Sequence, residues 1–177
     1  MMRLERGSGR LYAMMLTLTV VVVLLDQLTK FWAVSTLSGD ERVAVLPPLI
    51  HFRLLYNAGA ALSIGSGATW VFTLVAAGAV AGILYAARRL ASPGWALVLG
   101  ALLGGAVSHL GDRLLRQPGF ARGHVVDFID YGPFVGNVAD IALVGGGVAL
   151  VLLTLRGVPF AKASAKASAK APAEEAV

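Results

Sequence analysis

Two aspartates stand in apolar surroundings in this sequence. Asp127 lies in the apolar run 125–129, and Asp140 is followed at once by a long apolar stretch; neither has a lysine or arginine within four positions. Two carboxyl groups brought to one partly desolvated site cannot both ionise easily, so one keeps a proton while the other stays charged. The charged member of such a pair can activate water while the protonated member polarises a carbonyl, which is the chemistry of an aspartyl protease.

Other charged residues have simpler structural interpretations. Asp26 and Lys30 are spaced i, i+4, so they share a helix face and can form an ion pair. Asp112 and Arg113 can likewise pair with each other at the membrane interface. For these residues a structural role explains the pattern as well as a functional one does.

Histidine and cysteine content bears on metal chemistry. The chain has no cysteine, which excludes disulfides, thiolate metal sites and a cysteine nucleophile. His109 near a helix end is typical of a packing residue. His124 and Asp127 are three apart and could ligate a metal, but no third and fourth ligand stands at a defined spacing. We therefore expect neither a metal nor a cofactor.

Composition indicates the environment of these residues. Of the 177 residues, 57% are hydrophobic and only 14% are charged, which is typical of a membrane protein. The net charge of +5 comes from basic residues at the ends of apolar runs, not from a stripe shared with aromatics. These residues therefore indicate membrane topology and not nucleic-acid binding.

Four apolar runs are long enough to span a bilayer, at about residues 11–34, 70–87, 95–110 and 135–155. Nine of the fifteen basic residues flank these runs on what we expect to be the cytoplasmic side. They are Arg3, Arg6, Arg10, Arg88, Arg89, Arg156, Lys162, Lys166 and Lys170. The pattern predicts an all-α membrane protein of four transmembrane helices with both termini inside, and with segments of about 35–69 and 111–134 outside.

Helical rise then places three aspartates at a common depth. Asp26 lies 15 residues after Leu11, Asp112 lies 17 after Trp95, and Asp140 lies 16 before Arg156. Each offset corresponds to about 22 to 26 Å along a helix, which reaches the outer interface. Ionisable residues at membrane depth usually face an interior cavity with a function.

The remaining segments complete the predicted organisation. Residues 1–10 form a basic cytoplasmic start, 11–157 the four-helix domain, and 158–177 a disordered Ala/Lys/Ser-rich cytoplasmic tail. Residues 42–67 mix β-branched and aromatic residues with Pro and Gly, which predicts a small extracytoplasmic strand-rich element. The first run could instead be a cleaved signal peptide, but its apolar character continues to Phe31 and Trp32, so we expect it to stay.

Five motifs in order carry a family resemblance: "DQLTK", "NAGAAL", "GDR", "GHVVDF" and "NVAD". Over roughly residues 10–155 the chain resembles the type II, or lipoprotein, signal peptidases. The resemblance implies an intramembrane aspartyl protease of the bacterial plasma membrane that works near the extracytoplasmic face. Such an enzyme removes the signal peptide of diacylglyceryl-modified prolipoproteins just before the lipidated cysteine. It implies lipid-modified substrates and membrane lipid as partners, and we expect a monomer.

Carried over by position, the resemblance implies that Asp127 and Asp140 are the catalytic pair. The positions that it implies to be supporting or substrate-binding are Asp26, Lys30, Asn57, Gly59, His109, Asp112, Arg113 and Asn137. The asparagine amides can both donate and accept hydrogen bonds, which suits the holding of a peptide backbone.

The chain departs from the family pattern in several places. Ser108 and His109 replace a Gly-Asn pair, and a ring nitrogen of His109 can substitute for the lost amide. Gly136 and Leu62 stand where the family has Phe. Only twelve residues separate Asp127 from Asp140, which predicts a compact outer loop.

Two other classes of protein remain open from the residues. A small transporter or proton-relay protein would also carry carboxylates at one membrane face. Such proteins tend to show internal repeats, and none is evident in this sequence. A structural or assembly subunit would not need two asparagines and two aspartates at a common depth.

Overall fold

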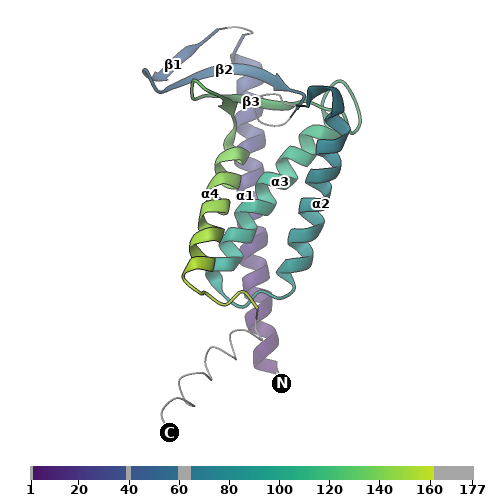
Figure 1. The fold of residues 1–177 in the computed structure, drawn as a ribbon, viewed down its shortest axis with the longest axis vertical. Coiled ribbons are helices and arrows are strands. Elements are labelled where there is room, and N and C mark those ends of the chain that lie inside the picture. The colour runs from purple at the N-terminus through teal and green to yellow at the C-terminus, as the bar shows by residue number, and fades with distance from the viewer. Residues whose placement is uncertain (1, 39–40, 60–64, 162–177) are drawn as a thin grey trace.

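The structure is a computed structural model that describes residues 2–38, 41–59 and 65–161. Four long helices form a bundle, and a small sheet lies across one end of it (Figure 1). The helices are α1 (Met2–Thr36), α2 (Thr69–Ala87), α3 (Pro93–Leu115) and α4 (Val138–Leu155), and the short 3-10 helix η2 (Ser66–Ala68) leads into α2. All four helices are long and apolar enough to cross a membrane, which confirms the four predicted spans.

Several helix ends differ from the prediction. Helix α1 begins at Met2, nine residues before the predicted start, so it includes most of the basic segment 1–10. Helix α3 continues to Leu115, so Asp112 and Arg113 are helical and do not belong to the outer segment 111–134. The helix extends because both side chains find partners on other elements, which hydropathy does not reveal. Helix α4 begins three residues later than predicted, because Asn137 caps it and the two residues before the cap form a strand.

The sheet contains β1 (Val43–Leu46), β2 (Ile50–Asn57), β3 (Val125–Asp130) and β4 (Val135–Gly136), all antiparallel in the order β1-β2-β3-β4. The predicted strand-rich element between the first two helices is confirmed for β1 and β2. The prediction missed β3 and β4, which come from the connection between α3 and α4. Every residue of β3 is buried, so its sequence shows no alternation of apolar and polar residues.

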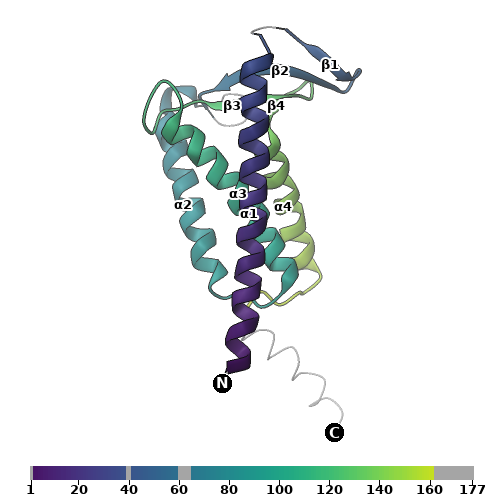
Figure 2. The ribbon, with the colours of Figure 1, turned by 180° about the vertical axis from the view of Figure 1, so that it is seen from behind.

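Helix α3 is the centre of the bundle and packs against the other three helices. Figure 2 shows α1 running along the bundle beside α3 and α4. Glycines permit the close approach: a Cβ on Gly104 would lie 2.6 Å from Cβ of Val22 in α1, and one on Gly105 would lie 2.5 Å from Cγ of Leu143 in α4. Helix α2 packs mainly on α3.

The outer surface of the bundle is apolar. Large exposed side chains on the helices include Leu24, Leu28, Leu74, Val75, Val144 and Val151. Exposed apolar area on this scale is unfavourable in water but favourable in a hydrocarbon environment. The chain is therefore a multi-pass membrane protein.

Candidate active site

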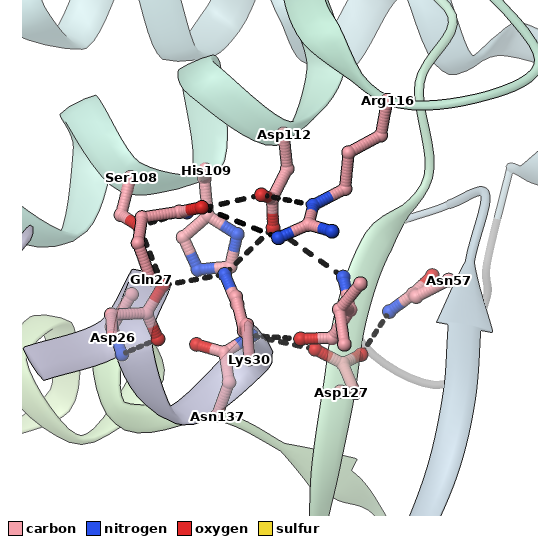
Figure 3. Close-up of polar contacts among 12 residues, drawn as sticks. Asp26, Gln27, Lys30, Asn57, Ser108, His109, Asp112, Arg116, Asp127 and Asn137 are labelled. Atoms are coloured by element: carbon pink, nitrogen blue, oxygen red, sulfur yellow. Dashed lines mark hydrogen bonds and ion pairs between the residues drawn. The ribbon is translucent and has the colours of Figure 1, made fainter. Parts of the chain in front are cut away.

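Asp127 is held by two asparagine amides. It lies on β3 and is 2% exposed. Asn57, the last residue of β2, donates from Nδ2 to Asp127 Oδ2 at 3.0 Å, and Asn137 donates from Nδ2 to Asp127 Oδ1 at 2.6 Å (Figure 3). Both carboxyl oxygens therefore accept hydrogen bonds from neutral groups.

The backbone fixes the orientation of these two amides. Gly59 N donates to Asn57 Oδ1 at 2.9 Å, and Asp140 N donates to Asn137 Oδ1 at 3.1 Å. Because each amide oxygen already accepts a backbone N–H, the amide nitrogen is the atom that faces Asp127. The hydrogen-bond network thus determines which groups surround the carboxyl.

Asp140 lies in the first turn of α4. Its Oδ2 accepts from Asn137 N at 2.9 Å, which completes a capping box with the bond from Asp140 N to the Asn137 side chain. Its Oδ1 lies 3.1 Å from Nε2 of His109, and its side chain is 37% exposed. The partial positive charge at a helix N-terminus favours a carboxylate at this position.

Both aspartates line one cavity of about 420 Å³, together with His109 and Arg113. The rest of the cavity wall is apolar. It is formed by Val75, Ala76 and Ala79 of α2, Ala106 of α3, and Leu143 and Val144 of α4. The cavity therefore combines a pair of carboxyl groups with an apolar chamber between three helices.

The electrostatic environment of Asp127 favours its protonated form. Burial raises the pKa of Asp127 to about 6, the nearby charge of Asp140 acts in the same direction, and the Asn57 hydrogen bond opposes the shift. Within the described residues, no lysine or arginine forms an ion pair with Asp127 or Asp140. This environment suits a carboxyl group that holds a proton.

Arg113 binds backbone carbonyl groups and not an acid. Its guanidinium donates to the carbonyls of Asn57 at 3.0 Å and Gly123 at 3.1 Å, and also to that of Gly59. The predicted pair between Asp112 and Arg113 is therefore wrong, because adjacent residues on a helix point in different directions. Arg113 instead joins the end of β2 to the segment before β3, which positions Asn57.

Asp26, Lys30 and Asp112 form a separate buried network between α1 and α3. Lys30 Nζ lies 2.6 Å from Asp26 Oδ2 and 2.7 Å from Asp112 Oδ2, and all three residues are at most 1% exposed. The predicted ion pair of Asp26 with Lys30 is correct. Arg116 adds a second cation, with Nε 2.6 Å from Asp112 Oδ1.

The same network reaches α4. Asp26 Oδ2 accepts from Ser108 Oγ at 2.5 Å, and Asp26 Oδ1 accepts from Ala139 N at 2.8 Å. Ala139 precedes Asp140 directly. The buried carboxylate of α1 therefore holds the first turn of α4, which carries Asp140.

Three members of this network, Gln27, Ser108 and Arg116, were not among the predicted site residues. Gln27 donates to Ser108 Oγ at 2.8 Å and to Asp112 Oδ1 at 3.0 Å, and Arg116 follows Asp112 by one helical turn. The i, i+4 spacing of Asp112 and Arg116 is a signal that the sequence contained. No local pattern indicates Gln27, because its partners lie on another helix.

Three further residues were singled out in the sequence: His124, Gly136 and Leu62. His124 is not among the described residues that line the cavity. A Cβ on Gly136 would lie 3.0 Å from Asp140 Oδ2, so the glycine allows the carboxyl group to approach the backbone. Leu62 lies outside the described residues.

A third aspartate of the sheet is paired with cations. Asp130, at the end of β3, is fully buried; its Oδ2 accepts from Arg42 Nη2 at 2.5 Å and lies 3.5 Å from Arg53 Nε. Burial alone would raise the pKa of Asp130, but the Gly132 N–H and Arg42 outweigh it and hold that pKa below its usual value. Asp130 thus forms structural ion pairs with Arg42 and Arg53 and is not among the described residues that line the cavity.

Known proteins resemble this chain in sequence and in structure. The family model for signal peptidase (SPase) II matches residues 18–156. A lipoprotein signal peptidase of Mycobacterium tuberculosis is 48% identical over 83% of this chain and 73% of its own length. One of Bifidobacterium longum subsp. infantis is 44% identical over 86% of each chain.

Two solved structures also resemble this chain. A structure described as a bacterial membrane enzyme superposes with a TM-score of 0.72 at 27% identity, covering 80% of this chain and 87% of that one. A second structure with the same description gives a TM-score of 0.70 over 80% and 92%. The family model covers most of the chain, including every element that lines the cavity, and the chain belongs to the signal peptidase II family.

Proposed function

We propose that the chain is an intramembrane aspartic endopeptidase that removes signal peptides from diacylglyceryl-modified bacterial prolipoproteins, with Asp127 and Asp140 as its catalytic pair. Membership of the signal peptidase II family supports the peptidase activity. The observation that carries the catalytic type is the presence of two aspartates, unpaired with any lysine or arginine of the described chain, on one cavity.

In the proposed mechanism the two carboxyl groups divide the acid and base roles. The charged carboxylate takes a proton from a water molecule, which attacks the scissile carbonyl, while the protonated carboxyl donates a hydrogen bond to the carbonyl oxygen. The scissile nitrogen then takes the proton that came from water, the C–N bond breaks to release an amine and a carboxyl group, and the pair returns to its starting state. Asn57 and Asn137 hold Asp127 throughout, and the apolar wall suits a signal-peptide segment and acyl chains.

The other carried-over residues have positioning roles in this proposal. Arg113 and Gly59 hold the loop that carries Asn57, and the ion pairs of Lys30 with Asp26 and Asp112 fix α1 against α3 and α4. We further propose that both termini are cytoplasmic, because nine of the fifteen basic residues flank the helix ends on that side. The sheet and the cavity mouth then lie at the extracytoplasmic face of the bacterial plasma membrane.

The decisive experiment compares two substrates of the purified chain in lipid or detergent. A prolipoprotein carrying the diacylglyceryl cysteine should be cut just before that cysteine, and the same polypeptide without the lipid should not. A small transporter or proton-relay protein would cut neither substrate, and that outcome would overturn the proposal.

Topology has an independent test, which the absence of native cysteine makes clean. A cysteine introduced at Gln117 should react with an impermeant thiol reagent from outside intact cells. One introduced at the exposed Pro93 should react only after permeabilisation. Labelling of the Pro93 position in intact cells would place the catalytic pair on the cytoplasmic face and contradict the proposed topology.

A further inference from the structure

His109 is the feature of the cavity in which this chain departs from the family pattern. We propose that His109 is a positioning residue that donates a hydrogen bond to Asp140, keeps Asp140 as the charged, water-activating member of the pair, and leaves the proton on Asp127. The inference rests on the proposed peptidase function and assigns the two acid–base roles within it.

The contact between His109 and Asp140 is direct. His109 Nε2 lies 3.1 Å from Asp140 Oδ1, and the imidazole is 20% exposed at the cavity wall. The other oxygen, Asp140 Oδ2, accepts from Asn137 N. With Nε2 protonated, as this hydrogen bond requires, each oxygen of Asp140 accepts one N–H, and hydrogen bonds of this kind favour the charged form of a carboxyl group.

The two aspartates differ in exposure and in their position on the backbone, and both differences favour the proton on Asp127. Asp127 is 2% exposed, whereas the Asp140 side chain is 37% exposed to the cavity. Asp140 lies at the positive end of α4, whereas Asp127 lies on a strand. The two amide hydrogen bonds to Asp127 favour its charged form, but burial outweighs them and raises the pKa of Asp127 to about 6. A single proton shared by the pair therefore belongs on Asp127.

The other ionisable groups around the cavity are engaged elsewhere. Arg113 donates to three backbone carbonyls and Lys30 bridges Asp26 and Asp112, so the charge of Arg113 acts on Asp127, and that of Lys30 on Asp140, without a direct contact. On the outer connection the pKa of Tyr131 is raised by burial and by the charge of Asp140, so its hydroxyl stays neutral. Helix α2 contributes only apolar residues to the described lining. Among the described residues, His109 is thus the ionisable base in contact with Asp140.

Side-chain length explains why histidine can perform this task from α3. Nε2 stands four bonds from Cα, one bond further than the amide nitrogen of an asparagine at the same position. The ring therefore spans the distance from α3 to the first turn of α4. Glutamine also places an amide nitrogen four bonds from Cα, so it provides a matched replacement for the donor.

The test compares His109→Phe with His109→Gln in cleavage of a lipidated prolipoprotein. His109→Phe keeps a ring and removes the donor, and we expect kcat to fall on the order of 10- to 100-fold with little change in KM. The acid limb of its pH profile should move to higher pH, because Asp140 then takes up a proton more readily. His109→Gln should restore most of kcat and return the acid limb toward its original place.

Matched controls separate positioning from folding. His124→Phe makes the same change outside the cavity and should leave kcat and both limbs as in the wild type. Thermal unfolding of each variant in detergent reports the fold, and His109→Leu replaces the phenylalanine variant if that chain does not fold. A merely structural role of His109 would lower the unfolding temperature without moving the acid limb.

Two results would overturn the inference. One is full kcat in the donor-free variants. The other is a lowered kcat whose acid limb stays in place, or which glutamine does not rescue. In either case the wild-type chain would still cut the substrate, so the peptidase function would stand. A wild-type chain that does not cut would contradict the proposed function itself.

Discussion

Two groups of carboxylates lie at the same end of the helix bundle but are satisfied in different ways. In the network between α1 and α3, Lys30 bridges Asp26 and Asp112, and Arg116 adds a second cation. In the cavity, Asp127 and Asp140 accept hydrogen bonds from amides, a backbone N–H and an imidazole, and no lysine or arginine of the described chain pairs with them.

This difference shows how one residue type serves two purposes within a single site. A buried carboxylate matched by cations has little reason to exchange protons, and it contributes to stability only while the match is complete. A buried carboxyl group without a cation keeps a proton at unusually high pH, which makes it available for chemistry. The charge balance around each aspartate therefore predicts which variants affect turnover and which affect folding.

The largest expected effect is on turnover in the cavity. Asp127→Asn and Asp140→Asn should each lower the cleavage rate of a lipidated prolipoprotein by several orders of magnitude, because the two groups act as one unit. Purified variants should keep the helical circular dichroism and the thermal unfolding of a folded protein. Substantial turnover by either variant would contradict the assignment of the pair.

The next largest effect is on folding through the α1–α3 network. Lys30→Met removes the cation shared by Asp26 and Asp112 and leaves buried charge uncompensated, so we expect a loss of about 3–5 kcal/mol in the free energy of unfolding. Denaturant unfolding in detergent measures this loss. Arg122→Gln is the control: Arg122 is exposed and forms no ion pair among the described residues, so its removal should change the free energy of unfolding by about 0.5 kcal/mol or less.

A variant of Lys30 that unfolds like the wild type would break the comparison. Such a result, combined with lost cleavage, would assign Lys30 to the reacting groups. If the Lys30 variant folds stably and cleaves fully, Asp26 and Asp112 would take up protons when the Lys30 cation is removed, with no loss of stability.

A smaller effect concerns pH. Because the pKa of Asp127 is raised to about 6, its proton persists to that pH, and kcat/KM should fall as pH rises through about 6. The Asn57 hydrogen bond favours the charged form of Asp127, so Asn57→Ala should raise that pKa and move the alkaline limb to higher pH, with a lowered maximum. His51→Gln, on the same strand, is the control that should leave the limb in place.

Two other outcomes for the alkaline limb of the Asn57→Ala variant would contradict this prediction. A limb that is the same in Asn57→Ala and in the wild type would mean that Asp127 does not carry the proton of the pair. A limb that moves to lower pH would mean that the amide stabilises the protonated form instead.

The smallest expected effect is that of a chelator, which should leave cleavage unchanged. The described residues contain no group of three or more His, Cys, Asp or Glu side chains that could hold a metal ion, and the oxygens of Asp127 already accept two amide hydrogen bonds. Cleavage in the presence and absence of a strong chelator measures this. If a chelator inactivates the enzyme and added zinc restores cleavage, Asp127 and Asp140 bind a cation. They would then no longer differ in this respect from Asp26 and Asp112, which are paired with cations.

Sequence alone predicts the helices well and the sheet only in part. Hydropathy placed α2 within one residue at its start, because a membrane span depends on a local property of the chain. The same signal ended α3 too early, since Asp112 and Arg113 are compensated by residues of other elements. Strand β3 was missed because pairing of Leu55 with Asp127 joins segments that are distant in sequence.

The candidate site was likewise predictable from the sequence only in part. The motifs brought attention to Asp127, Asp140 and the two asparagines, and the structure places all four together. The motifs could not give the partners of Arg113, which are backbone carbonyls and leave no mark in the sequence. The motifs also could not show which aspartates are paired with a cation, because ion pairs such as that of Lys30 with Asp112 form between different helices.

The hydrogen bond from Ala139 N to Asp26 Oδ1 joins the first and the last helix of the bundle. During synthesis the Asp26 carboxylate enters the membrane long before its partner on α4 exists, and it can meet Lys30 and Ser108 first. The hydrogen bond to its Oδ1 forms only when α4 packs against α1, and the same helix carries Asp140. Docking of α4 on α1 therefore completes the hydrogen bonding of Asp26 and brings Asp140 to the cavity in one step.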